Sequence, residues 1–162
     1  MNCPTIDIPS ASLAPATRLR AALDYWERLR GRRAMPSRAE LDPAELPRPL
    51  SSVMLVDVLR EPIDFRFRLI GGDIEAISFR NYHGIRFSDI FHMRPGSQVF
   101  TDYLHVVQTR RPLWSDIDYV GFDPGIARIH HALLPLSDDG DRVDTVLAII
   151  EIERARPRPQ PQ

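Results

Sequence analysis

The chain has 162 residues, of which 43% are hydrophobic and 27% charged, which suits one globular domain with a sizeable core. Its 21 lysine and arginine residues nearly balance its 22 aspartate and glutamate residues, so the broad positive surface typical of nucleic-acid-binding proteins is excluded. No apolar run approaches the roughly 20 residues of a membrane-spanning helix. Neither nucleic acid nor a membrane is therefore an expected partner.

The number of cysteines indicates whether the protein works in an oxidising or a reducing compartment. Cys3 is the one cysteine, so no disulfide can form within the chain, which favours a reducing environment. The N-terminus has no basic region followed by an apolar stretch, so no signal peptide is predicted. We expect a cytoplasmic protein.

The N-terminal part divides into a tail and a helix. Residues 1–15 contain several prolines and serines and are predicted to be disordered. Apolar side chains then recur at helical spacing, which predicts an amphipathic helix over residues 16–31. Its apolar stripe contains Leu19, Leu23 and Trp26. The stripe has two predicted uses, which are compatible: it covers the outer face of the chain's own sheet, or it pairs with the same helix of a second chain.

Short helical turns are predicted next. Ser37 with Glu40, and Asp42 with Glu45, each have the spacing of a capping box. Two strands follow, over residues 53–59 and 64–70, and the turn residues between them predict a hairpin. After the second strand come Gly71 and Gly72, and the spacing becomes helical, with Asp73 as the predicted cap.

The second half of the chain contains one longer helix and three strands. The helix is predicted over residues 97–110, and the strands over residues 113–120, 126–134 and 143–151. Two turns containing aspartate and glycine join the strands. The domain is predicted to span residues 16–153, and the proline- and arginine-rich residues 154–162 are predicted to be a disordered tail.

This order of elements predicts the fold class α+β. Both groups of strands are linked as hairpins, so the sheet is expected to be antiparallel and five-stranded, with its helices mainly on one face. The N-terminal amphipathic helix is an additional element.

Six short motifs occur in a characteristic order. They are Trp26, PSRAELDP from Pro36, LVDV from Leu55, FRFRLIGG from Phe65, NYHG from Asn81 and LPLSDDG from Leu134. In this order the sequence resembles the PAS domain, and in particular the stand-alone PAS-like proteins of alphaproteobacteria, over residues 20–150. One departure is Gly72, where that branch usually has threonine, which leaves the following helix less firmly fixed.

The resemblance implies how the double glycine is used. In a PAS fold the second strand ends at the rim of a ligand cavity, and the chain turns sharply there, with backbone angles that glycine permits. Three alternate side chains of this strand would face the core, namely Phe65, Phe67 and Leu69. The first helix would cover the stems of Arg66 and Arg68 on the other face.

The resemblance also implies a cavity between the helices and the sheet. Its candidate ligand-binding residues are Phe67, Ile77, Tyr82, Arg86, Phe91, Phe100, Tyr103 and His131. Such aromatic and aliphatic side chains suit a small apolar ligand with one or two polar anchors, for which Arg86 and His131 are the candidates. The alternative for most of the aromatic residues is that they simply fill the core.

No cofactor is required by the sequence. Haem-binding PAS sensors carry a proximal histidine on the long helix, where this chain has His105, and the alternative is a surface histidine. The cysteine of flavin photosensors is missing before that helix, which excludes their photochemistry and leaves open a flavin bound without it. His130 and His131 are strand neighbours that point to opposite faces, so they are not expected to share a metal ion.

No hydrolase, metalloprotease or nucleotide-binding motif is present. The resemblance therefore implies a non-enzymatic sensory or interaction module. No output domain is expected, so a signal would leave through an unknown partner protein or through self-association, with a homodimer expected. The alternatives are a small enzyme, such as a hydrolase or isomerase, in the same cavity, or an assembly module with a vestigial cavity.

Overall fold

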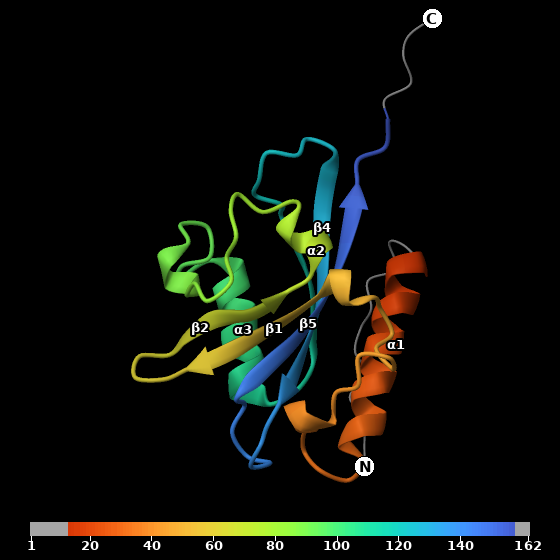
Figure 1. The fold of residues 1–162 in the computed structure, drawn as a ribbon, viewed down its shortest axis with the longest axis vertical. Helices are drawn as coiled ribbons and strands as arrows, with labels where there is room; N and C mark the ends of the chain where they lie inside the picture. The colour runs from red at the N-terminus through yellow and green to blue at the C-terminus, as the bar shows by residue number, and fades with distance from the viewer. Residues whose placement is uncertain (1–12, 158–162) are drawn as a thin grey trace, which may run out of the picture.

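A five-stranded antiparallel sheet organises the chain (Figure 1). The computed structural model describes residues 13–157, and the predictions for residues 1–12 and 158–162 lie outside this part. The strands are β1 (Val53–Leu59), β2 (Asp64–Ile70), β3 (Leu113–Ile117), β4 (Ile126–Leu136) and β5 (Thr145–Arg154). Their order across the sheet is β2-β1-β5-β4-β3. The predicted hairpin of β1 and β2 is confirmed, and pairing of β1 with β5 joins the two strand groups.

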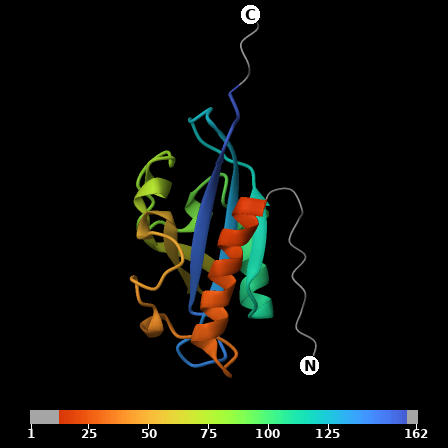
Figure 2. The same ribbon diagram turned by 90° about the vertical axis from the view of Figure 1, so that its right-hand side faces the viewer.

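Helices cover both faces of this sheet. They are α1 (Leu13–Arg30), α2 (Gly72–Glu75) and α3 (Gln98–Thr109), with the 3₁₀ turns η1 (Arg38–Glu40), η2 (Leu50–Ser52) and η3 (Phe87–Asp89). Figures 1 and 2 show α1 on one face, beside β4 and β5, and α3 on the opposite face. None of the helices in the described part is long and apolar enough to cross a bilayer.

Coverage of both faces explains the apolar run in β5. Residues 145–150 are all buried, although alternate side chains of a strand point to opposite faces. On one face β5 packs against α1, and on the other face its Ile150 lines the cavity described below. A central strand of this kind reads as a continuous apolar segment.

The apolar stripe of α1 packs on the chain's own sheet. Leu19 and Trp26 are buried, and the indole Nε1–H of Trp26 donates a hydrogen bond to the Pro135 carbonyl at 2.7 Å. Leu23 is half-buried beside Trp114. The first of the two predicted uses of the stripe is therefore what the fold shows. Pairing with a second chain through Leu19, Leu23 and Trp26 stays a prediction, and of these three only Leu23 is partly exposed.

A β-bulge corrects the predicted faces of β2. Leu55 lies opposite Leu69 and Val56 lies opposite Phe67, so Arg68 is an extra residue in β2. Such a bulge changes which side chains face the core beyond it. Phe65 and Phe67 are buried, as expected, but Leu69 is 38% exposed. The prediction that Leu69 faces the core is therefore wrong.

The two arginines of β2 are held by a carboxylate, not by α1. Asp57 on the neighbouring strand accepts from Arg68 Nε at 2.6 Å and from Arg66 Nη2 at 3.4 Å. The first helix packs over β4 and β5, whereas β2 is at the edge of the sheet. The expectation that α1 covers the stems of these arginines is thus wrong.

One of the two predicted capping boxes is present. Ser37 Oγ accepts from the Ala39 amide at 3.3 Å, and Glu40 Oε2 accepts from the Ser37 amide at 2.7 Å. These bonds define η1. Asp42 instead accepts from the Ala44 amide at 2.9 Å within a simple turn, so no second helix forms there.

The double glycine places two segments in close contact. Gly71 has ordinary extended angles, φ −68° and ψ 151°, so a special backbone conformation is not the reason for it. A Cβ atom on Gly71 would lie 2.3 Å from the carbonyl oxygens of Leu50 and Ser51, whereas one on Gly72 would meet nothing within 4 Å. Gly71 therefore permits close packing of η2 against the end of β2.

The start of α2 also differs from the prediction. Gly71 is the N-cap, without a side-chain cap, and Asp73 lies within the first turn. Its Oδ2 accepts from the hydroxyls of Ser51 at 2.8 Å and Ser52 at 3.2 Å. Asp73 thus fastens α2 to η2 instead of capping the helix.

The two glycines give a matched pair of substitutions. We expect Gly71→Ala to lower the free energy of unfolding by about 3 kcal/mol, because the added methyl group meets backbone atoms that cannot move aside cheaply. Gly72→Ala is expected to change it by no more than about 1 kcal/mol, because the space is open and the angles suit alanine. Urea denaturation of both variants tests this, and equal losses would contradict the close-contact explanation.

Candidate functional site

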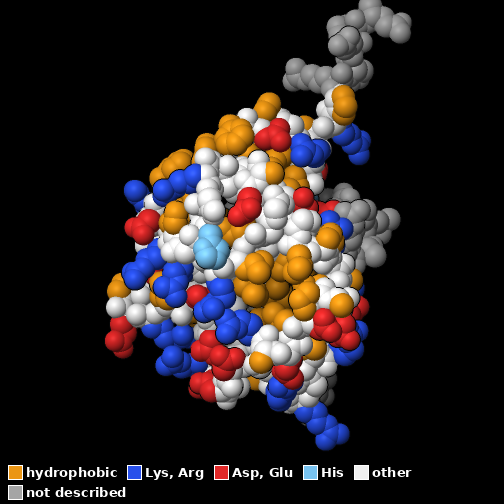
Figure 3. All heavy atoms as spheres, viewed as in Figure 1, with side chains coloured by type: hydrophobic (Ala, Val, Ile, Leu, Met, Phe, Trp, Pro, Cys, Tyr) orange, Lys and Arg blue, Asp and Glu red, His pale blue; other side chains and the backbone are white. Residues whose placement is uncertain are grey.

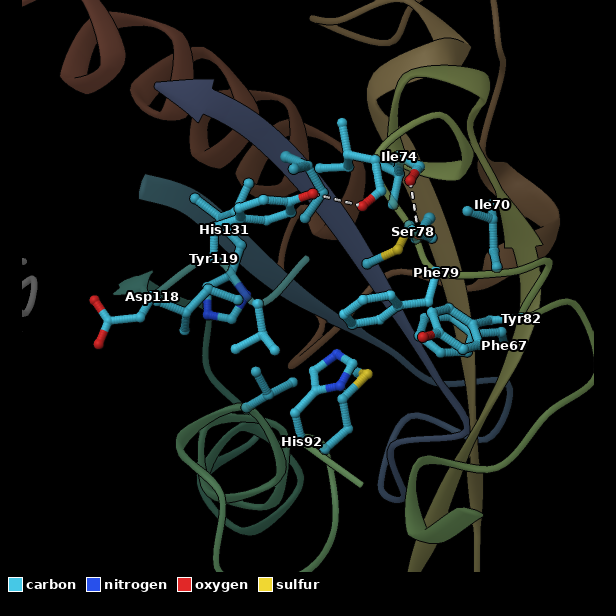
Figure 4. A pocket seen from close by; sticks show the side chains of 18 of the residues that line it. Phe67, Ile70, Ile74, Ser78, Phe79, Tyr82, His92, Asp118, Tyr119 and His131 are labelled. Carbon is cyan, nitrogen blue, oxygen red and sulfur yellow. Dashed lines mark hydrogen bonds between the residues drawn. The ribbon is translucent and has the colours of Figure 1, made fainter. Parts of the chain in front are cut away.

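An apolar cavity lies between the sheet and the helical layer that contains α2 and α3 (Figure 4). Its volume is about 140 Å³. The lining consists of Met54, Phe67, Ile70, Ile74, Ile77, Ser78, Phe79, Tyr82, His92, Met93, Val99, Tyr103, Ile117, Asp118, Tyr119, Val120, Ile129, His131 and Ile150. All five strands or their ends contribute to it, so the site depends on the assembled sheet.

A cluster of aromatic rings fills the space beside the cavity. The ring of Phe65 lies 5.4 Å from that of Phe87, 5.1 Å from that of Phe100 and 5.3 Å from that of Tyr103, between centroids. Phe67 adds a contact with Phe87 at 4.8 Å. These rings separate α3 from β2, and the cavity begins where the cluster ends, at Phe67 and Tyr103.

Five of the eight predicted ligand-binding residues line the cavity: Phe67, Ile77, Tyr82, Tyr103 and His131. The other three do not. Phe100 is buried in the aromatic cluster, Arg86 is exposed and forms a backbone bridge with Arg66, and Phe91 is 66% exposed. Arg86, one of the two predicted polar anchors, is therefore excluded from the lining.

Exposed aromatic rings surround the mouth of the cavity. Phe79 lines it, and its ring lies 5.9 Å from that of Phe122, 6.3 Å from that of Phe91 and 6.0 Å from that of His92. Figure 3 shows apolar side chains gathered along the upper part of the molecule, over the connection between β3 and β4. We call Phe79, Phe91 and Phe122 the aromatic rim.

Two hydrogen bonds stabilise the cavity wall at α2, of which the first joins it to the β3–β4 connection (Figure 4). The Tyr119 hydroxyl donates to the Ile77 carbonyl at 2.9 Å. The Ser78 hydroxyl donates to the Ile74 carbonyl at 2.7 Å. Both hydroxyl protons are therefore engaged within the protein.

Tyr103 places a buried hydroxyl near the cavity. The side chain is 1% exposed, and its Oη has no hydrogen-bond partner among the described residues. Burial raises the pKa of this hydroxyl, and the charge of Asp102 raises it further. The group therefore stays protonated, and in this conformation its oxygen is shielded from the open space of the cavity.

His92 contributes a second unpaired atom. Its Nδ1 is buried and lacks a hydrogen-bond partner within the described part of the chain. Burial lowers the pKa of the imidazole, so the ring is neutral at pH 7. Figure 4 shows His92 beside Phe79, and their rings meet edge to face.

His131 connects the cavity to α3. It lines the cavity from β4, and its Nε2 lies 3.1 Å from Asp102 Oδ2 on α3. The residue next to Asp102 is Tyr103, whose ring lies 6.4 Å from that of His131. Two adjacent residues of α3 therefore contact the cavity wall, one directly and one through the imidazole.

The lining contains few charged side chains. Asp118 is its one carboxylate and points away from the cavity (Figure 4), and neither arginine nor lysine is among the lining residues. Asp102 adds a second carboxylate immediately behind His131. The lining is thus largely apolar, with the His131–Asp102 pair as its polar contact to α3.

The remaining histidines lie away from the cavity. His105 is exposed on α3 and is not part of the lining, so the structure offers it no position as a haem ligand. His130 points to the other face, between Asp116 at 2.6 Å and Glu153 at 2.9 Å. Within residues 13–157, no three His, Cys, Asp or Glu side chains lie close enough to hold a metal ion.

Sequence reasoning did not identify several lining residues. Met54, Ile129 and Ile150 come from strands with little alternation, which hides the face that each side chain takes. Ile70 faces the cavity because of the bulge at Arg68. His92 lies in an irregular segment that has no periodicity, so nothing in its sequence pattern predicts its direction.

The unpaired hydroxyl gives a direct prediction. We expect Tyr103→Phe to raise the free energy of unfolding of the ligand-free protein by about 1 kcal/mol, because the substitution removes a buried donor without a partner and keeps the ring. Thermal and urea denaturation measure the change. A loss of about 1 kcal/mol or more would mean that the hydroxyl has a partner in solution.

The family comparison agrees with this architecture. The sequence matches the family described as PAS domain over residues 15–151, which includes the strands β1 to β4 and most of β5 and α1. Neither the comparison with curated proteins nor that with solved structures produced a match. The family match covers most of the chain, and PAS domains act as sensory or interaction modules in general. The chain therefore belongs to the PAS domain family.

Proposed function

We propose that this PAS domain is a non-catalytic, cytoplasmic sensory module that binds a small ligand in the cavity between sheet and helices. The observation that carries this proposal is the apolar cavity of about 140 Å³ between the sheet and the helices, to which all five strands or their ends contribute. An unfilled apolar space of this size loses packing contacts that a ligand can supply. A ligand that fills it would recover that free energy on binding.

The proposed signal passes through α3. A ligand beside Tyr103 and His131 contacts α3 directly and also through the hydrogen bond between His131 and Asp102. It would favour the position of α3 in which all these contacts form, and thereby shift the population of conformers. No separate pathway is needed, because the two contact points are neighbours on one helix.

We place the contact with a signalling partner or a second copy at the aromatic rim. Phe91 and Phe122 are 66% and 63% exposed, and they contact Phe79, which lines the cavity. Leu19 and Trp26 are already buried against the chain's own sheet, so a homodimer would leave α1 in place. A rim that touches both ligand and partner is a short route for the signal.

A small enzyme is the second candidate. The observation that favours it is the His131–Asp102 pair in the cavity wall, since a carboxylate that orients an imidazole is a common acid–base arrangement. The Ser78 hydroxyl, however, donates to a carbonyl. Recovery of a bound compound unchanged after long incubation favours the sensor. Conversion that His131→Gln abolishes favours the enzyme.

Native mass spectrometry of the purified protein tests the main proposal. We expect an additional mass that disappears on denaturation, and the same spectrum gives the oligomeric state. In Ile129→Phe the larger ring occupies the cavity, so we expect the additional mass to be lost. Ile152→Phe is the matched control, because Ile152 pairs with Ile129 across β4 and β5 but does not line the cavity.

Two results of this experiment would contradict the proposal. Retention of the same mass by Ile129→Phe would place the ligand elsewhere. Absence of any retained or added ligand, with circular dichroism unchanged, would favour the reading in which the domain is an assembly module alone.

A further inference from the structure

The aromatic rim lies beside the point where the chain leaves the sheet. We propose that residues 156–162, with the sequence RPRPQPQ, turn back onto the rim and cover Phe122 and Phe79 as a proline-rich segment. We call residues 156–162 the C-terminal segment. This docking concerns the surface outside the cavity, so it does not depend on a ligand there. Where the proposed function places a partner at the rim, the C-terminal segment competes with that partner.

The rim has the chemistry that proline-rich segments recognise. Phe79 contacts both other rings, with centroid distances of 5.9 Å to Phe122 and 6.3 Å to Phe91. In the order Phe79, Phe91 and Phe122, the side chains are 47%, 66% and 63% exposed. Single apolar side chains on a surface are ordinary, but a contiguous exposed patch marks an interaction site. Surfaces lined by aromatic rings are those on which proline-rich segments dock.

The C-terminal segment starts beside this patch. Arg154 Nη1, at the end of β5, lies 3.3 Å from Asp123 Oδ2, and the Ala155 amide donates to the Gly125 carbonyl at 2.9 Å. Phe122 precedes Asp123 in the chain. Figure 1 shows the end of β5 beside the β3–β4 connection. The sheet therefore delivers the segment to the same connection that carries one of the three rim rings.

The segment is long enough to cross the rim. In the polyproline II conformation a residue advances about 3.1 Å, so residues 156–162 span roughly 20 Å. Phe122 is three residues from Gly125, and the ring of Phe79 lies 5.9 Å beyond that of Phe122. Both rings are within this reach. Arg156 and Pro157 are exposed, so docking adds contacts for them.

The composition of the segment favours docking at a low entropic cost. Pro157, Pro159 and Pro161 alternate with polar residues. Each proline fixes its own φ and biases the residue before it towards an extended backbone. Little conformational freedom is therefore lost on binding, as for other segments that are extended in advance. The proline rings supply apolar contacts to the phenylalanine rings, and a guanidinium group can lie over a ring face.

Charge complementarity also favours this segment. Asp123 in the β3–β4 connection already pairs with Arg154. Asp118, in the same connection, is exposed and has no ion-pair partner among residues 13–157. Arg156 and Arg158 are the next cations along the chain, so the arginines of the segment face a connection that carries carboxylates.

Tethering favours the chain's own segment over a second copy. A segment joined by a short linker acts at an effective concentration of roughly millimolar. A second copy or another protein must therefore bind the rim tightly enough to displace it. This makes the C-terminal segment a built-in competitor for the rim.

Backbone relaxation of the ¹⁵N-labelled full chain tests the proposal. We expect amide order parameters of about 0.8 at Arg158 and Gln160, as in ordered backbone, and values below about 0.6 in Phe122→Ser. Leu69→Ser is the matched control, because it removes an exposed apolar side chain that is not part of the rim, and it should leave the order parameters unchanged. Nuclear Overhauser effects from proline ring protons to the Phe122 or Phe79 ring identify the contact.

A triple variant tests the role of the prolines. Pro157→Ser, Pro159→Ser and Pro161→Ser together should lower the order parameters at Arg158 and Gln160 as far as Phe122→Ser does, because the stiffness and the apolar contacts are both lost. Circular dichroism that matches the unaltered protein shows that the domain itself is intact.

Three results would overturn the inference. The first is an order parameter below about 0.6 at Arg158 and Gln160 in the unaltered chain. The second is ordering that Phe122→Ser or the triple variant leaves unchanged. The third is a set of Overhauser effects found only between labelled and unlabelled chains in a mixed sample, which would make a second copy the occupant. The mass of a retained ligand is measured separately, so the proposed function of the cavity stands or fails independently.

Discussion

The packing of Phe65 against three other rings is the contact on which the rest of the site depends. Phe65, Phe87, Phe100 and Tyr103 form a cluster with centroid separations of 4.9 to 5.4 Å, which sets the distance between α3 and the sheet. Aromatic rings are rigid and pack with defined geometry. The cavity occupies the neighbouring part of the same interface, so its volume follows from the spacing that the cluster imposes. Tyr103 belongs to both, with its ring in the cluster and its hydroxyl unpaired.

The two faces of the sheet have separate tasks because of this arrangement. On one face, α1 is fixed by the apolar contacts of Leu19 and the hydrogen bond of Trp26 to Pro135. On the other face, α2, η3 and α3 enclose a space that is not completely filled. A well-packed outer face supports the sheet, while the inner face keeps an apolar cavity that side chains do not fill. Such a division lets a ligand act on α3 without disturbing the rest of the core.

The sequence predicted the layout better than the site. Strand bounds at β1 and β2, the antiparallel sheet and the capping box at Ser37 follow from local patterns that short-range physics enforces. The faces that Leu69 and Ile70 take cannot be predicted from local alternation, because a bulge that depends on pairing between strands reverses them. Arg86 and Phe91 were wrongly predicted to line the cavity, because they lie in an irregular segment. Such a segment has no periodic pattern that indicates which side chains face inwards. The role of Gly71 depends on a contact with η2, about twenty residues earlier in the chain, and no local pattern contains it.

The central claim is that occupancy of the cavity is linked to α3 through Tyr103 and the His131–Asp102 bond. Amide chemical shifts in ¹H–¹⁵N spectra during titration with acetophenone test it most directly. We expect shifts at His131, Asp102 and Tyr103 together with the lining of α2, and little change at α1. In His131→Gln the shift at Asp102 should shrink while that at Tyr103 persists. Shifts confined to α1, or to the outer face of β4 and β5, would contradict the account.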